Sequence, residues 1–258
     1  MSAATTPTLD LTPGHRLVSL AERPDLIDPS VEHNRAAWPA FMLEAPVANG
    51  LFWRCFSDSP ELQFVLHDAD ERLVATNNCM PLVWDGSDDD LPAGWDDQVQ
   101  RSVRDHDEGR PANTLGAMQI VVRADLRGAG HAGTMIRVMR SAAEAAGYHA
   151  LIACVRPTLK PRYPLTTIQR YASWTRADGL PFDPWIRLHA RLGGRLVRAA
   201  PESMRIEGSV ADWERWTGVP MPDSGEYVID GATQPVRIDR ERDQGRYFDQ
   251  NVWMVHQL

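Results

Sequence analysis

The chain has 258 residues, of which 43% are apolar and 24% charged, and its formal net charge is −8 at pH 7. This composition indicates a globular protein of one large or two small domains, and the acidic balance argues against nucleic-acid binding. We expect no signal peptide, because the first residues lack a basic region followed by an apolar one. The sequence contains no CxxC pair and no apolar run of the roughly 20 residues that span a membrane, so we predict a cytoplasmic protein without a metal site.

The N-terminal half predicts a strand, helices and a hairpin. Residues 1–14 are rich in Thr, Pro and Ser and are expected to form a flexible tail. The following elements are, in order, a strand at 16–20, one or two helices within 24–44, hairpin strands at 62–67 and 72–83, an acidic loop at 84–92 and a helix at 95–109.

The most informative stretch runs from residue 117 to residue 136, where an apolar strand leads through a Gly-rich turn into a helix. Met135, Val138, Met139 and Ala142 share one helical face, and Gly147 suits the C-terminal cap. Glycines let the backbone approach a ligand, and the first helical N–H groups are unpaired and carry partial positive charge. We therefore predict a pyrophosphate cradle whose helix begins at about His131.

Two kinds of nucleotide site share this arrangement. Gly128, Gly130 and Gly133 match the dinucleotide fingerprint GxGxxG, but polar and mixed residues separate the strand from the first glycine. The acidic residue that should follow about 20 residues later is missing. Arg156 in that region would suit a 2′-phosphate, so an NADP-dependent oxidoreductase stays a distant alternative. A P-loop is excluded, because no Gly-Lys-Ser or Gly-Lys-Thr follows.

The segment Val122-Arg-Ala-Asp-Leu-Arg127-Gly-Ala-Gly130-His-Ala132 resembles the acyl-CoA signature of the GNAT acetyltransferases, Arg/Gln-x-x-Gly-x-Gly/Ala. Arg127, Gly130 and Ala132 occupy its three defining positions. The resemblance implies an α/β (α+β) GNAT fold, a mixed central sheet of about seven strands that splays at the acyl-CoA site and is flanked by helices. It also implies that acetyl-CoA or another acyl-CoA is held by Ile120, Val121, Val122, Arg127, Gly128, Ala129, Gly130, His131, Ala132 and Gly133.

No carboxylate stands where this family often carries its general base. Met118 and Gln119 occupy the matching positions on the strand before the cradle. Gln119 is predicted to orient a water, and the resemblance implies that the Ile120 N–H acts as an oxyanion donor to the thioester carbonyl. The base is therefore expected elsewhere or through a bridging water, or the acceptor arrives already deprotonated. Asp85, His106 and Tyr163 are the candidates from other segments.

A short helix is expected at 184–192, with Asp183 as its N-cap and Pro184 at its first position. The second half of this helix and the glycine after it, Leu188-His-Ala-Arg-Leu-Gly193, resemble the GNAT segment Phe-Tyr-x-x-Leu-Gly-Phe. In that family the Tyr hydroxyl protonates the leaving thiolate. The resemblance implies that His189 does this, provided that its imidazole is protonated at that moment. A structural hydrogen bond in the helix packing is the alternative.

Two segments are weak candidates for binding the acceptor. Tyr163 and Trp174 belong to an irregular insertion at about 156–184, which is interpreted as a lid or wall of the acceptor pocket or as a self-packed surface excursion. Trp84 and Asp85 open the acidic loop, which would attract a cationic amine unless it is only a solvated turn.

The C-terminal part predicts strands at 195–199, 226–229, 236–238 and 252–255 and a helix at 210–216. Residues 15–258 thus read as one GNAT-like domain, similar to an actinobacterial-type subgroup. The resemblance implies an N-acyltransferase, most simply an N-acetyltransferase, that moves an acyl group from CoA to a small-molecule amine by direct attack in a ternary complex. A carrier-protein or aminoacyl-tRNA donor and a non-catalytic CoA-binding module are the alternatives. We expect a monomer or homodimer.

Overall fold

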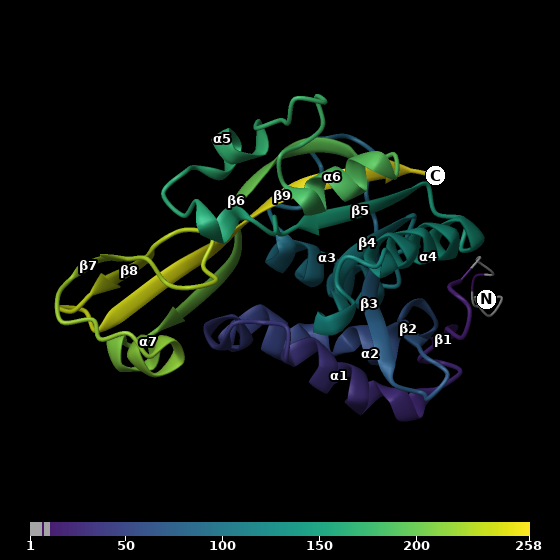
Figure 1. Cartoon of the computed structure of the whole chain (residues 1–258), viewed down its shortest axis with the longest axis horizontal. Coiled ribbons are helices and arrows are strands. Elements are labelled where there is room, and N and C mark those ends of the chain that lie inside the picture. Colours follow the sequence, from purple (N-terminus) through teal and green to yellow (C-terminus); the bar gives the residue numbers. More distant parts are fainter. Residues whose placement is uncertain (1–6, 8–10) are drawn as a thin grey trace.

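The computed structural model describes residue 7 and residues 11–258 (Figure 1). Most of the tail expected over residues 1–14, namely 1–6 and 8–10, lies outside the described residues. Within them, nine strands form one mixed sheet in the order β1-β2-β3-β4-β5-β9-β8-β7, with β6 paired to β9. The strands are β1 (Arg16–Ser19), β2 (Phe64–His67), β3 (Leu73–Leu82), β4 (Thr114–Val122), β5 (Ala150–Val155), β6 (Arg195–Gly208), β7 (Gly225–Tyr227), β8 (Val236–Asp239) and β9 (Gln244–Gln257).

The two central strands β4 and β5 separate part of the way along their length. They are parallel and pair only from Thr114 with Ala150 to Ala117 with Ala153. On the other side of β4, Ala117 lies opposite Cys79 and Gln119 lies opposite Asn78, so Met118 is the extra residue of a β-bulge. A bulge bends its strand and increases its twist, which carries the end of β4 away from β5. The expected splayed sheet is confirmed.

Helices cover both faces of the sheet (Figure 1). Helix α4 buries Met135, Val138, Met139 and Ala142 against one face, which confirms the periodicity of its sequence. On the other face, α3 buries Val99 and contributes to a separate core cluster. The helices are α1 (Ile27–Arg35), α2 (Arg54–Asp58), α3 (Trp95–Asp107), α4 (His131–Ala145), α5 (Ile168–Ala172), α6 (Pro184–Arg191) and α7 (Val210–Thr217). No helix among the described residues is long and apolar enough to cross a membrane.

Strands β6 and β9 are much longer than their sequences indicate, and their far ends form an arm with β7 and β8 at one end of the molecule (Figure 1). Strand β6 continues past the expected 195–199 because irregularities between Leu196 and Arg198 and between Ala200 and Met204 let it stay paired with β9. The β7–β8 hairpin then joins the far end of β9. These additions bring the sheet to nine strands, compared with the expected figure of about seven.

The insertion after β5 folds around its own aromatic cluster. The rings of Tyr163, Tyr171, Trp174 and Phe182 pack against one another with centroid separations of 5.0–6.2 Å. The buried Lys160 ammonium ties this segment to the loop before β8 by donating to the carbonyl oxygens of Tyr163 and Thr233. The insertion is therefore an ordered unit that sits on the sheet.

Candidate active site

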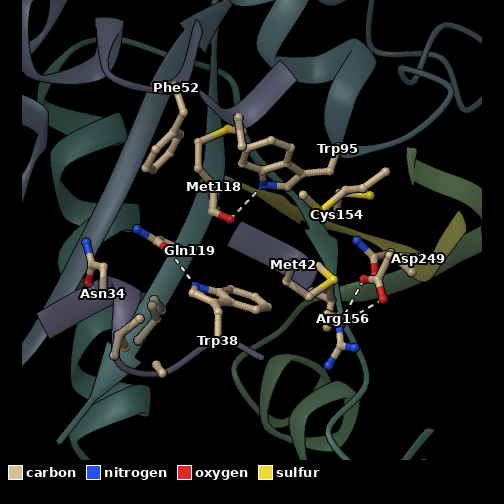
Figure 2. A pocket seen from close by; sticks show the side chains of 18 of the residues that line it. Asn34, Trp38, Met42, Phe52, Trp95, Met118, Gln119, Cys154, Arg156 and Asp249 are labelled. Carbon is tan, nitrogen blue, oxygen red and sulfur yellow. Dashed lines mark hydrogen bonds and ion pairs between the residues drawn. The ribbon is translucent and has the colours of Figure 1, made fainter. Parts of the chain in front are cut away.

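A cavity of about 730 Å³ occupies the gap between β4 and β5. We use the name cradle half for the part lined by Ile120, Val121, Val122, Arg127 and Ala132. We use the name chamber half for the part lined by Asn34, Trp38, Phe52, Trp95, Arg156 and Asp249, which Figure 2 shows from close by. Both halves belong to one cavity.

The cradle half is built from main chain. Gly128 and Gly130 have φ angles of 89° and 93°, a left-handed conformation that glycine adopts without strain, and α4 begins at His131 as expected. Within the described residues, the backbone N–H groups from Gly130 to Gly133 donate no hydrogen bond. A Cβ added at Gly128 or Gly130 would meet nothing within 4 Å. Open backbone with free amides at a helix N-terminus fits a pyrophosphate.

The free edge of β4 also offers amides to this gap. The Arg123 N–H donates to the Val74 carbonyl of β3 over 2.9 Å. Because neighbouring residues of a strand point their amides to opposite sides, the N–H groups of Ile120 and Val122 face the gap. Strand-like hydrogen bonds from these amides suit an extended pantetheine arm, and the position of Ile120 fits an oxyanion donor.

Gln119 is held in a polar network that links the two halves of the cavity (Figure 2). Its Oε1 accepts the Trp38 indole N–H at 3.2 Å, and its Nε2 donates to Asn78 Oδ1 at 2.8 Å. Asn34 donates to the same Asn78 oxygen at 3.1 Å and accepts the Thr76 hydroxyl at 2.5 Å. The network fixes the Gln119 amide and leaves one N–H and one lone pair of that amide for a ligand or water.

The bulge in β4 is secured from α3. The Trp95 indole N–H donates to the Met118 carbonyl at 2.9 Å (Figure 2). Gln98 Nε2 donates to the Ala117 carbonyl at 3.3 Å. These bonds satisfy carbonyl groups that lose their regular partners at a bulge. The extra helix between the hairpin and the cradle strand therefore shapes the site.

An ion pair lies in the wall of the chamber half. Arg156 follows β5, and its Nε donates to both carboxylate oxygens of Asp249 at 2.9 and 3.0 Å, while its Nη2 donates to the Gly231 carbonyl at 2.6 Å. Burial alone would lower the pKa of Arg156, but the charge of Asp249 outweighs this effect and raises it. The guanidinium is thus charged and held in one orientation.

His189 is nearly fully buried in the wall of the cavity on α6. Its Nδ1 lies 2.9 Å from Nε2 of His256, and its Nε2 has no partner within the described residues. Burial and the neighbouring His256 lower the pKa of His189 to about 3, and burial lowers that of His256 to about 4. At neutral pH both rings are therefore uncharged, so the protonated imidazole required for the expected acid is not the ground state.

The four weak acceptor candidates all lie outside the lining of the cavity. Trp84 is buried and donates to the Ser87 carbonyl, and Asp85 accepts the Ser87 amide within its own loop. The acidic loop is partly neutralised, because Asp88 pairs with Arg195 and Asp90 with Arg101. Tyr163 and Trp174 belong to the aromatic cluster of the insertion.

The chamber half contains the residues that sequence reasoning missed. Trp38, Phe52 and Trp95 carry no local motif, and Arg156 had been considered only as a partner for a 2′-phosphate. The structure instead pairs Arg156 with Asp249, 93 residues away. A charged pair so distant in sequence leaves no spacing that a single chain can reveal.

Comparison with known proteins agrees with this geometry. The chain is 31% identical to the arginine N-acetyltransferase avaD of Aspergillus versicolor, over 97% of this chain and 96% of that protein. Its fold is similar to the loading GNATL domain of CurA from Lyngbya majuscula, with a TM-score of 0.58 at 13% identity over 94% of this chain and 97% of that one.

A second similar fold is that of the GNAT-like decarboxylase GphF, solved in complex with isobutyryl-CoA. The TM-score is 0.57 at 16% identity over 94% of this chain and 98% of that one. No protein-family model matches the chain. The full-length relationship to an N-acetyltransferase, together with the splayed sheet and the cradle, decides the assignment. The chain belongs to the GNAT family and is an acyl-CoA-dependent N-acetyltransferase.

Proposed function

We propose that the chain transfers an acetyl group from acetyl-CoA to the α-amine of arginine or a closely related basic amino acid. The observation that carries this proposal is the single cavity that joins the cradle half to the chamber half through the gap between β4 and β5. The arginine N-acetyltransferase relative supports the acceptor class. Of the nitrogens of arginine, the α-amine is the nucleophile, because the pKa of a guanidinium lies above about 12 and the group stays protonated at neutral pH.

The main chain does most of the work in the proposed reaction. The amides of Gly130 to Gly133 bind the pyrophosphate, and the Ile120 N–H stabilises negative charge on the carbonyl oxygen of the thioester. A thioester is already activated, so holding an amine about 3 Å from its carbonyl supplies much of the acceleration. The free amide valences of Gln119 orient the amine or a water beside it.

Neutral His189 is proposed as a hydrogen-bond donor near the departing sulfur. His256 Nε2–H can donate to His189 Nδ1, which leaves the proton of His189 on Nε2. The thiolate then receives a hydrogen bond and takes its proton from the acceptor amine or solvent. This role needs no imidazolium, in keeping with the lowered pKa of about 3.

The remaining elements of the proposal concern the cell and the assembly. A cytoplasmic location is supported by the three cysteines, Cys55, Cys79 and Cys154, which are all buried and unpaired. We also propose that acetyl-CoA is the preferred acyl donor and that the protein is a monomer or a homodimer.

Two measurements test the proposal. Acetyl-CoA and CoA should raise the melting temperature of the protein, and NADPH should not. A thiol reagent should then report CoA release with arginine, and mass spectrometry should place the acetyl group on the α-amine. Binding of acetyl-CoA without turnover on arginine, lysine, agmatine, spermidine or glucosamine would show a non-catalytic CoA-binding module.

A further inference from the structure

We propose that Arg156 binds the carboxylate of the acceptor, so that the chamber half selects amino acids over amines that lack this group. The inference rests on the proposed function. Arg156 lines the cavity, and its Nε and Nη2 are taken by Asp249 and Gly231. Among the described residues, Nη1 takes no part in these three hydrogen bonds, although the guanidinium also interacts with the Tyr247 hydroxyl. A fixed guanidinium with one free N–H edge is a ready site for a carboxylate.

The Asp249 carboxylate is not available to bind a cationic amine. It is fully buried, and Oδ1 accepts the Tyr247 hydroxyl at 2.5 Å and the Thr233 hydroxyl at 3.1 Å in addition to Arg156. Both carboxylate oxygens are therefore engaged by the protein. The function that remains for Asp249 is to hold the Arg156 guanidinium charged and aimed, and we assign the contact with the acceptor to Arg156 alone.

Trp38 connects Arg156 to the reaction centre. The Arg156 Cζ lies 5.9 Å from the centre of the Trp38 ring, and the indole N–H of Trp38 donates to Gln119, next to Ile120 (Figure 2). Arg156 and Gln119 thus contact the same indole. In an α-amino acid the amine and the carboxylate are attached to one carbon, and we assign the amine to β4 and the carboxylate to the Arg156 side of the Trp38 ring.

The same charge determines how an arginine acceptor would be oriented. Arg156 repels the guanidinium of the substrate, which then turns toward the aromatic wall formed by Phe52, Trp53 and Trp95. Aromatic faces bind cations, and Trp53 is 55% exposed at the rim. The carboxylate contact is therefore specific to Arg156, and side-chain variation of the acceptor should be tolerated at the rim.

Arginine and agmatine test the inference, since agmatine is arginine without its carboxylate. We expect kcat/KM of the wild-type enzyme to be about 100-fold higher for arginine, the size expected for charge-assisted hydrogen bonds. Arg156→Lys keeps a positive charge beside Asp249 but loses the fork of donors, so the arginine-to-agmatine ratio should fall at least about 10-fold. Arginine amide, which keeps only a carbonyl, should behave like agmatine.

Controls separate recognition from folding. Arg101→Lys is matched, because the side chains of Arg101 and Arg156 are both 18% exposed and paired with an aspartate, and it should leave the ratio unchanged. The double variant Arg156→Met/Asp249→Asn avoids a buried unpaired carboxylate and should lower the ratio toward one. Equal use of arginine and agmatine by the wild type, or an unchanged ratio in Arg156→Lys, would overturn the inference. Absence of transfer to any amine would instead remove the proposed function.

Discussion

The cradle half and the chamber half are built from different chemical groups, which come from different parts of the chain. In the cradle half, a contiguous stretch from Ile120 to Gly133 offers backbone amides, and its side chains matter little. In the chamber half, side chains arrive from α1 and the segment after it, from α3, from the end of β5 and from β9. A donor common to a whole family suits a main-chain site, and an acceptor particular to one enzyme suits a side-chain site.

The contrast gives each half its own sensitivity to substitution. Adding a side chain at a glycine of the cradle half should weaken the binding of acetyl-CoA and leave the selection of the acceptor amine unchanged. Removing polar atoms or aromatic rings from the chamber half should do the reverse. The four changes below separate the two halves, in order of decreasing expected effect.

Gly130→Val should have the largest effect. Gly130 has a φ of 93°, and its added side chain would enter the open cradle, so the KM for acetyl-CoA should rise about 100-fold as phosphate hydrogen bonds are lost. Gly147→Val is the matched control at the other end of α4, with a φ of 75° and equal space. It should lower the melting temperature and leave the KM unchanged. A similar KM increase in both variants would mean that strain alone weakens binding.

Trp38→Leu should act on the other half. It removes the hydrogen bond to Gln119 and the ring beside Arg156, so kcat/KM for arginine should fall about 10- to 30-fold while the affinity for acetyl-CoA changes little. Trp174→Leu is the control, because Trp174 packs in the insertion outside the cavity. If Trp174→Leu impaired acceptor use as strongly, the aromatic cluster of the insertion would also belong to the acceptor site.

His189→Phe should lower turnover about 10-fold and keep the affinity for CoA, because the ring position is filled but the donor is lost. Stability gives a second readout. The pKa values of His189 and His256 are lowered to about 3 and 4, so the unfolded chain binds protons first and the wild type loses stability as pH falls below about 6.5. The His189→Phe variant should lose less folding stability than the wild type over the same fall in pH. Unchanged turnover would remove His189 from the reaction.

Asp96→Asn should have the smallest effect and spare turnover. Burial, and then the charge of Asp249, raise the pKa of Asp96 to about 6 although the Arg205 amide opposes this. The folded protein therefore binds the proton more tightly, and Asp96 costs stability increasingly as pH rises from about 4 to 6. At pH 7 the variant should be more stable by about 1–3 kcal/mol, a gain that disappears below pH 4. Equal stability at pH 7 would contradict the raised pKa.

The sequence predicts the strand, the turn and the helix of the cradle half because their determinants are local. The strand, the Gly-rich turn and helix α4 follow one another directly in the sequence. The predicted N-cap hydrogen bonds of Asp183 at the start of α6 are also confirmed. The chamber half could not be predicted in this way. Trp38 and Gln119 are 81 residues apart, and Arg156 and Asp249 are 93 apart, so neither pair produces a periodic or spaced pattern.

The same limit explains the misjudged strands of the arm. Strand β9 contains charged and amide residues from Gln244 to Asn251 that do not alternate with apolar ones, yet it is paired throughout because β6 lies beside it. Tertiary context thus overrides a weak local preference. The position of Asp249 in the chamber half follows from that pairing.

The order of strands has a consequence for how the protein folds during synthesis. Strand β9 is the last described element to leave the ribosome, yet it occupies an interior place in the sheet between β5 and β8 and also pairs with β6. Until it arrives, β5 presents an unpaired apolar edge, which is a template for aggregation. The sheet and the chamber half therefore stay incomplete during synthesis until β9, which carries Asp249, has been made.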